Sequence, residues 1–169
     1  MKAFQSVSAL AEALREDLKD YGCVIGLDGF MLSGKTTLAF ELANLLSGIR
    51  MGLDSYVDPN FAATNYAEKL KIDYLAQDIK KLTKVFPFVV VDGICLLDVF
   101  ERISQPINAT VYIKRMSQNG VWHDGYHLED FEAGGNLQET NWLAKCEMAY
   151  HSIRLPHEHA QYLFQRVAA

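Results

Sequence analysis

The sequence predicts a three-layer α/β domain with a mostly parallel sheet and flanking helices. Short apolar runs of the kind that form central parallel strands occur at residues 23–27 and 88–91. They alternate along the chain with longer segments whose apolar residues recur every three or four positions. This alternation implies right-handed crossovers and a sheet covered on both faces. The 169 residues suffice for one such domain, spanning 1–169, and are too few for two substantial ones.

The first elements follow from apolar spacing and from the glycines that end them. Apolar positions between residues 4 and 21 keep helical spacing, and Gly22 ends this expected helix. The apolar run 23–27 is the first expected strand. A glycine-containing turn then leads into a helix over 35–47, and residues 50–53 form the next strand.

The second half of the chain continues the alternation of strands and helices. Its expected elements are a helix at 66–84, a strand at 88–91, a helix at 96–103, a strand at 108–114 and a helix at 141–153. Asn65 and Glu68 resemble a reciprocal cap at the start of the first of these helices. Residues 116–137 hold several glycines and no clean period, which indicates a loop or lid. Residues 162–164 fit either a last strand or a helical end.

The composition limits the classes of partner. The formal net charge is -5, and the Lys and Arg residues are scattered, which disfavours nucleic acid. No apolar run approaches the roughly 20 residues needed to cross a bilayer. Residues 1–22 lack the continuous apolar stretch of an export signal. We therefore expect a cytoplasmic protein that binds neither nucleic acid nor membrane, and a homodimer stays open because it leaves no readable signature.

One segment points to a particular chemistry. This segment, residues 29–36, leads from the strand expected at 23–27 into the helix expected at 35–47. Its pattern of Gly, four residues and Gly-Lys-Thr is that of a phosphate-binding loop. Such a loop aims backbone N–H groups and the positive end of the following helix at phosphate oxygens. Lys35 is then placed to reach the outer phosphates and Thr36 to ligate Mg²⁺. The residues expected to bind the nucleotide are Gly29, Phe30, Met31, Leu32, Ser33, Gly34, Lys35, Thr36 and Thr37.

Three acidic residues are expected near this loop. Asp92 ends the strand at 88–91, where it could orient magnesium through water. Asp54 follows the strand at 50–53, at the sheet edge where ligands bind, and could accept a proton from a substrate hydroxyl. Asp28 precedes the loop and is a competing base or a second carboxylate near the metal. The alternative interpretation is that Asp92 and Asp54 are ordinary turn residues.

The same residues resemble the uridine kinase and phosphoribulokinase-like branch of P-loop kinases. The matching segments are Ser33 to Ala39, Leu53 to Tyr56, Val91 to Ile94, and more weakly Pro156 and Ala160. The resemblance implies ATP as the donor, magnesium, and Asp54 as the catalytic base. It also implies that Tyr56 lies close to the acceptor, where Asp28 is a further candidate contact.

The resemblance is weakest in the lid. That family's lid usually brings several arginines to the transferring phosphate, whereas this chain offers Lys114 and Arg115 followed by mostly neutral and acidic residues. Arg115 is the expected catalytic cation. We therefore expect an ATP-dependent kinase that phosphorylates a hydroxyl of a small molecule, with a nucleoside such as uridine as one candidate. The alternative is a regulatory nucleotide-binding protein without kinase turnover.

Overall fold

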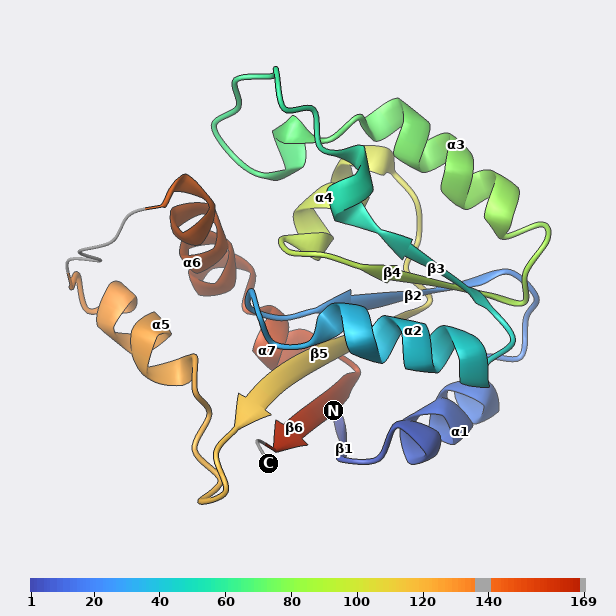
Figure 1. Ribbon diagram of the computed structural model, residues 1–169, viewed down its shortest axis with the longest axis horizontal. Coiled ribbons are helices and arrows are strands. Elements are labelled where there is room, and N and C mark those ends of the chain that lie inside the picture. Colours follow the sequence, from blue (N-terminus) through green and yellow to red (C-terminus); the bar gives the residue numbers. More distant parts are fainter. Residues whose placement is uncertain (136–140, 168–169) are drawn as a thin grey trace.

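The computed structural model describes residues 1–135 and 141–167, and its strands form one six-stranded sheet (Figure 1). The strands are β1 (Lys2–Phe4), β2 (Cys23–Asp28), β3 (Ile49–Gly52), β4 (Phe88–Asp92), β5 (Ala109–Met116) and β6 (Tyr162–Val167). Their spatial order is β1-β6-β5-β2-β4-β3, and each of these neighbouring pairs is parallel. The carboxyl ends of β2, β3 and β4 therefore meet at one edge of the sheet.

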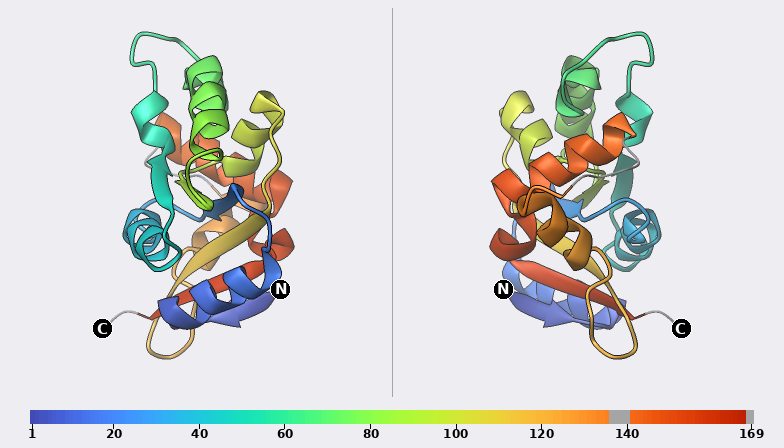
Figure 2. Two further views of the ribbon diagram at one scale, coloured as in Figure 1. Left: turned by 90° about the vertical axis from the view of Figure 1, so that its right-hand side faces the viewer. Right: turned by 90° about the vertical axis from the view of Figure 1, so that its left-hand side faces the viewer.

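Helices cover both faces of this sheet. They are α1 (Val7–Asp17), α2 (Lys35–Leu45), α3 (Ile72–Leu82), α4 (Leu96–Ile103), α5 (Gly125–Glu132), α6 (Trp142–Arg154) and α7 (Pro156–His159), with 3-10 turns η1 (Leu53–Tyr56) and η2 (Ala67–Lys69). Figure 2 shows α2 and α4 on opposite sides of the sheet, with α5 and α6 beside each other at one end. Within the two described ranges, no helix is both long and apolar enough to cross a membrane.

Strand β2 is buried on both faces, which explains its continuously apolar sequence. Ile25 and Leu27 pack into one core with Leu42 of α2, whereas Val24 packs into the other core with Leu75 of α3. Side chains alternate along a strand, so a strand buried on both faces needs apolar residues at successive positions. The two cores on either side of one sheet confirm the predicted three-layer class.

The N-terminal segment differs from the single helix expected there. Residues 2–4 form β1, which pairs with β6, and α1 begins only at Val7. Ser6 caps α1, because its Oγ accepts a hydrogen bond from the backbone N of Ala9 at 3.4 Å. Phe4 had fitted the helical period by coincidence, since a three-residue edge strand is too short to show a period of its own.

The helix expected at 66–84 is shorter than predicted. Asn65 Oδ1 does accept a hydrogen bond from the backbone N of Glu68 at 3.0 Å. Leu70, however, has an extended backbone and forms an antiparallel bridge with Val57. The cap therefore supports only η2, and α3 begins after this interruption.

The segment expected to be a lid contains regular structure. Met116 forms an antiparallel bridge with Trp122, and α5 follows within the predicted 116–137 loop. Positions 136 and 137 lie outside the described residues. The open choice at 162–164 is settled as a strand, and the other expected elements agree with the structure to within a few residues.

Candidate functional site

The loop between β2 and α2 has a backbone that requires glycine at both motif positions. Gly29 has a φ of 148° and Gly34 a φ of 94°, values that residues with a Cβ rarely adopt. A Cβ on Gly29 would also lie 2.8 Å from the carbonyl oxygen of Ile113. The loop ends at the N-terminus of α2, so its N–H groups and the helix end can meet an anion together.

Lys35 folds back over this loop. Its Nζ donates hydrogen bonds to the carbonyl oxygens of Gly29 and Phe30, both at 2.7 Å. The side chain is buried, and this burial lowers the pKa of the ammonium while nearby carboxylates oppose the shift. These carboxylates belong, from the strongest influence to the weakest, to Glu147, Asp28, Asp92 and Asp54. Lys35 is thus a cation with four carboxylates in its surroundings.

A cavity of about 580 Å³ opens beside the loop, a size typical of ligand sites. It is lined by Met31, Leu32, Gly34, Lys35, Thr36, Asp54, Asp92, Gly93, Ile94 and Leu143. The structure therefore brings the predicted Lys35, Thr36, Asp54 and Asp92 to one space. Three different segments supply them, because β2, β3 and β4 end at the same sheet edge.

Thr36 and Asp92 are in contact. The Thr36 hydroxyl donates to Asp92 Oδ2 at 3.1 Å. Hydroxyl and carboxylate oxygens suit magnesium, which also keeps waters and substrate phosphate oxygens as ligands. Among the residues that the structure describes, no three or more His, Cys, Asp or Glu side chains gather to hold a metal by themselves. This donor pair fits magnesium only together with a bound nucleotide.

Arg50 is a site residue that sequence reasoning missed. Its Nε donates to Asp92 Oδ1 at 2.7 Å and its second guanidinium nitrogen donates to Oδ2 at 2.9 Å. Its guanidinium also lies 4.7 Å from the ring centroid of Phe40. The pairing of β3 with β4 creates these contacts, so only a correct strand order could have signalled them. Arg50 fixes the orientation of the Asp92 carboxylate.

Asp54 lies in η1, immediately after β3, and is held by a tyrosine. Tyr66 donates its hydroxyl to Asp54 Oδ1 at 2.8 Å, and Tyr66 is buried. Tyr56, the tyrosine expected near the acceptor, instead donates to Asp78 Oδ2 on α3 at 2.9 Å. Burial raises the pKa of Tyr56 to about 12. The structure therefore places Tyr66, and not Tyr56, beside the acidic group of the cavity.

Asp28 lies behind the loop and does not line the 580 Å³ cavity. Its carboxylate accepts a hydrogen bond from the backbone N of Gly29 at 2.8 Å and another from the hydroxyl of Tyr150. Burial raises the pKa of Asp28 to about 6. Through these contacts Asp28 supports the loop, and it lines a different cavity, of about 260 Å³, from the one that holds Asp54.

Arg115 is engaged in an ion pair. Its guanidinium donates to Asp124 Oδ1 at 2.5 Å, and it does not line the cavity. The loop after β5 folds back at this point, since the backbone N of His123 donates to the Arg115 carbonyl oxygen at 2.9 Å. Of the predicted catalytic residues, the structure brings Lys35 and Asp54 together and leaves Arg115 outside.

Glu147 of α6 is a second residue that the sequence did not reveal. Its Oε1 accepts a hydrogen bond from the backbone N of Met31 at 2.6 Å, and its side chain is 3% exposed. Burial raises the pKa of Glu147 to about 7, although Lys35 opposes the shift. In the sequence, Glu147 is one acid within an amphipathic helix, which is typical of a solvated face. No local signal separates it from a surface residue.

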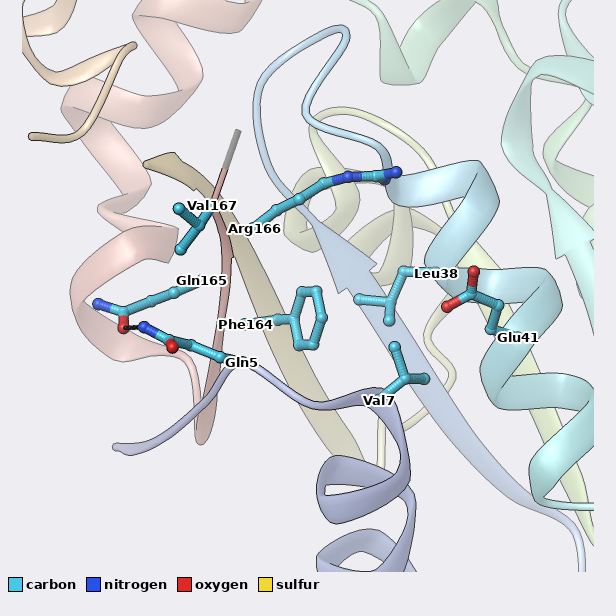
Figure 3. A pocket seen from close by; sticks show the side chains of 8 residues that line it. All are labelled: Gln5, Val7, Leu38, Glu41, Phe164, Gln165, Arg166 and Val167. Atoms are coloured by element: carbon cyan, nitrogen blue, oxygen red, sulfur yellow. Dashed lines mark hydrogen bonds between the residues drawn. The ribbon is translucent and has the colours of Figure 1, made fainter. Parts of the chain in front are cut away.

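A second cavity, of about 310 Å³, lies between α2, β6 and the segment that joins β1 to α1 (Figure 3). In Figure 3, Leu38 and Val7 lie on the same side of Phe164 of β6, and Arg166 extends toward the start of α2. A guanidinium nitrogen of Arg166 donates to the carbonyl oxygen of Gly34 at 3.4 Å. Arg166 thus connects this cavity, whose lining is half polar and half apolar, to Gly34 in the wall of the larger cavity.

Comparison with known proteins places this chain by its fold. No protein-family model and no curated protein matches the sequence. A possible uridine kinase from Bacillus stearothermophilus superposes with a TM-score of 0.63 at 15% identity, covering 94% of this chain and 96% of that one. A putative fructose transport system kinase from Silicibacter sp. TM1040 gives 0.58 at 13%, covering 95% and 100%. The chain has the three-layer P-loop NTPase fold, and its structural neighbours include P-loop kinases.

Proposed function

We propose that this protein is an ATP- and Mg²⁺-dependent kinase that phosphorylates a hydroxyl group of a small molecule. The observation that carries the proposal is the single cavity shared by Lys35, Thr36, Asp92 and Asp54. Lys35, Thr36 and Asp92 suit a metal-bound phosphate chain. Asp54 adds a carboxylate that could contact the acceptor. Phosphoryl transfer depends mainly on such positioning and on charge stabilisation.

The phosphate side of the reaction would rest on the loop and on α2. Backbone N–H groups at the α2 end of the loop would hold the phosphates, and Lys35 would exchange its carbonyl contacts for phosphate oxygens. Thr36 and Asp92 would hold Mg²⁺, which would neutralise part of the phosphate charge. Arg50 would keep Asp92 oriented for this role.

The acceptor side would rest on Asp54. The acceptor oxygen would attack the terminal phosphorus, the bond from that phosphorus to the bridging oxygen would break, and ADP would leave. The hydroxyl proton would pass to Asp54. Tyr66 occupies Asp54 Oδ1, which leaves Oδ2 for the acceptor. The apolar walls at Ile94 and Leu143 suit an uncharged compound, and a nucleoside such as uridine is one candidate.

The nucleoside part of ATP would occupy the 310 Å³ cavity of Figure 3. Phe164 and Leu38 would supply the apolar contact area, and Arg166 would lie between the base and the phosphates. Arg115 would have to leave Asp124 before it could meet the transferring phosphate. We therefore assign Arg115 to a closed form of the enzyme.

The test is ADP release with ATP and Mg²⁺ against a panel of nucleosides, sugars and other hydroxyl compounds, with Lys35→Ala as the blank. Asp54→Asn should lower kcat by about 100-fold to 10,000-fold, the usual contribution of a general base, and leave ATP affinity within a few-fold. Asp73→Asn, which removes an exposed acid of α3, is the matched control. Unchanged acceptor-dependent turnover in Asp54→Asn would remove Asp54 from this role.

A nucleotide-binding protein without turnover is the second candidate. The observation that favours it is the pairing of Arg115 with Asp124, which leaves Lys35 as the one Lys or Arg among the described residues that line the cavity. Tight ATP binding with no stimulation of ADP release by any acceptor would select this candidate.

A further inference from the structure

Glu147 has no part in the proposed transfer, yet it occupies a backbone donor of the phosphate loop. Its carboxylate accepts the N–H of Met31 at 2.6 Å and is almost completely buried. It reaches the loop from α6, one turn beyond Leu143 in the cavity wall. A carboxyl oxygen therefore already takes one of the N–H groups that phosphate loops offer to phosphate oxygens.

The charge around Glu147 makes this contact consequential. Glu147 is the strongest charged influence on Lys35, whose ammonium reaches the outer phosphates in such loops. Titratable groups from several elements face Glu147: Lys35 from α2, Asp28 from β2, Cys95 before α4, Tyr112 from β5 and Asp124 from the loop after β5. His151 contacts the backbone carbonyl oxygen of Glu147 through its Nδ1. Lys35 is the one group in this set that carries a positive charge near neutral pH.

We infer that Glu147 is a specificity-determining residue, whose ionised carboxylate opposes the terminal phosphate of a triphosphate and favours nucleoside diphosphate in the loop. This inference rests on the proposed nucleotide site. The terminal phosphate adds charge near Lys35, where the carboxylate already lies in a site of low dielectric constant, so the repulsion is poorly screened. A diphosphate brings less charge to the same place.

Neutralising Glu147 should remove this preference. Burial raises the pKa of Glu147 to about 7, so the carboxylate is mostly ionised at pH 8.5 and mostly protonated at pH 6. The preference for diphosphate should accordingly weaken as the pH falls. Gln at this position keeps an oxygen that can accept the Met31 N–H and has no charge.

The experiment is calorimetric titration with ADP and with a non-hydrolysable ATP analogue at saturating Mg²⁺, from pH 6 to pH 8.5. For the wild-type protein, the affinity ratio of analogue to ADP should rise about tenfold as the pH falls. Glu147→Gln should have the high ratio at every pH. Glu129→Gln, which removes an exposed acid of the neighbouring α5, should behave like the wild type.

Three outcomes would overturn the inference. A wild-type ratio that does not change with pH would do so without any variant, even if Glu147→Gln failed to fold. A pH dependence that is the same in wild type and Glu147→Gln would assign the effect to another group. A wild-type protein that binds neither nucleotide would refute the proposed function itself, and this inference with it.

Discussion

Two regions of the molecule differ in how many of their buried polar atoms have hydrogen-bond partners. In the phosphate half, residues 23–92, the side chains of Asp28, Lys35 and Asp92 each have hydrogen-bond partners. In the C-terminal half, residues 109–159, several buried polar atoms have none among the described residues. These atoms are Tyr112 Oη, Arg115 Nε, Trp122 Nε1, Asp124 Oδ2, His151 Nε2 and His157 Nδ1. Ser33 Oγ is the corresponding atom in the phosphate half.

This difference separates a region whose named buried polar side chains are paired within the protein from one in which several buried polar atoms are not. A buried donor or acceptor without a partner costs about 1–3 kcal/mol. Unpaired buried atoms therefore reduce stability more in the C-terminal half than in the phosphate half. Arg115, which does not line the 580 Å³ cavity, belongs to the C-terminal half.

The largest expected effect separates two lysines. Lys35→Ala should weaken ATP binding by about 100-fold, because a contact between an ammonium and a phosphate is worth up to about 3 kcal/mol. Lys114→Ala should change it by less than about threefold, since Lys114 Nζ lies 4.1 Å from the Trp122 ring centroid and Lys114 does not line the cavity. Titration calorimetry with ATP and Mg²⁺ measures both. Equal losses of ATP affinity in the two variants would contradict a difference between the halves in nucleotide binding.

Glu147, which accepts a hydrogen bond from Met31 in the other half, should make the stability of the protein depend on pH. Burial raises the pKa of Glu147 from 4.5 to about 7, so its stabilising contribution is complete below pH 4.5 and is lost as the pH rises through about 7. The wild type should therefore lose up to about 3 kcal/mol of unfolding free energy relative to Glu147→Gln between pH 4.5 and pH 8. Urea unfolding across this range measures the gap. A gap that stays constant with pH would contradict the expectation.

Two arginine pairs should differ in their contribution to stability. Arg50→Ala leaves the Asp92 carboxylate, which is 4% exposed, without its guanidinium, and should cost about 2 kcal/mol of unfolding free energy. Arg154→Ala removes contacts with Asp98 and Glu101 in which every side chain is at least one-third exposed, and should cost less than about 1 kcal/mol. Chemical denaturation of both variants gives the values. The reverse order would show that Arg50 does not hold Asp92.

The smallest effect should have opposite signs in the two halves. Tyr112→Phe removes a buried hydroxyl without a partner and should stabilise the protein by about 1 kcal/mol. Tyr66→Phe removes the hydroxyl that binds Asp54 and should destabilise it by about 1 kcal/mol. Thermal unfolding of the two variants compares them directly. Destabilisation by Tyr112→Phe would mean that its hydroxyl has a partner, such as an ordered water.

Most of the fold could be predicted from the sequence because its signals are local. The buried runs at 23–27 and 88–91 and the helix at 96–103 appear where their apolar patterns placed them. The failures are short or interrupted elements. Strand β1 has three residues, and the extended backbone at Leu70 splits a segment whose side chains keep helical spacing.

The predicted site divides in the same way. The phosphate loop lies within eight consecutive residues, so its glycine spacing, Lys35 and Thr36 are readable directly. Tyr56 matched a motif, but its hydroxyl turns to Asp78, and Tyr66 takes the place beside Asp54. A local motif specifies which residue types are present and does not determine the direction in which each side chain points.

The sequence by itself determined the α/β class, the loop and the acids that follow the strands, because each depends on neighbours within one strand or turn. Tertiary structure alone decided that Arg50 holds Asp92, that Asp28 supports the loop from behind and that Glu147 binds Met31 across 116 positions of the chain. The physical reason is that a charge acquires its role from what lies within a few ångströms of it, and distant segments reach that range only when the sheet and helices pack.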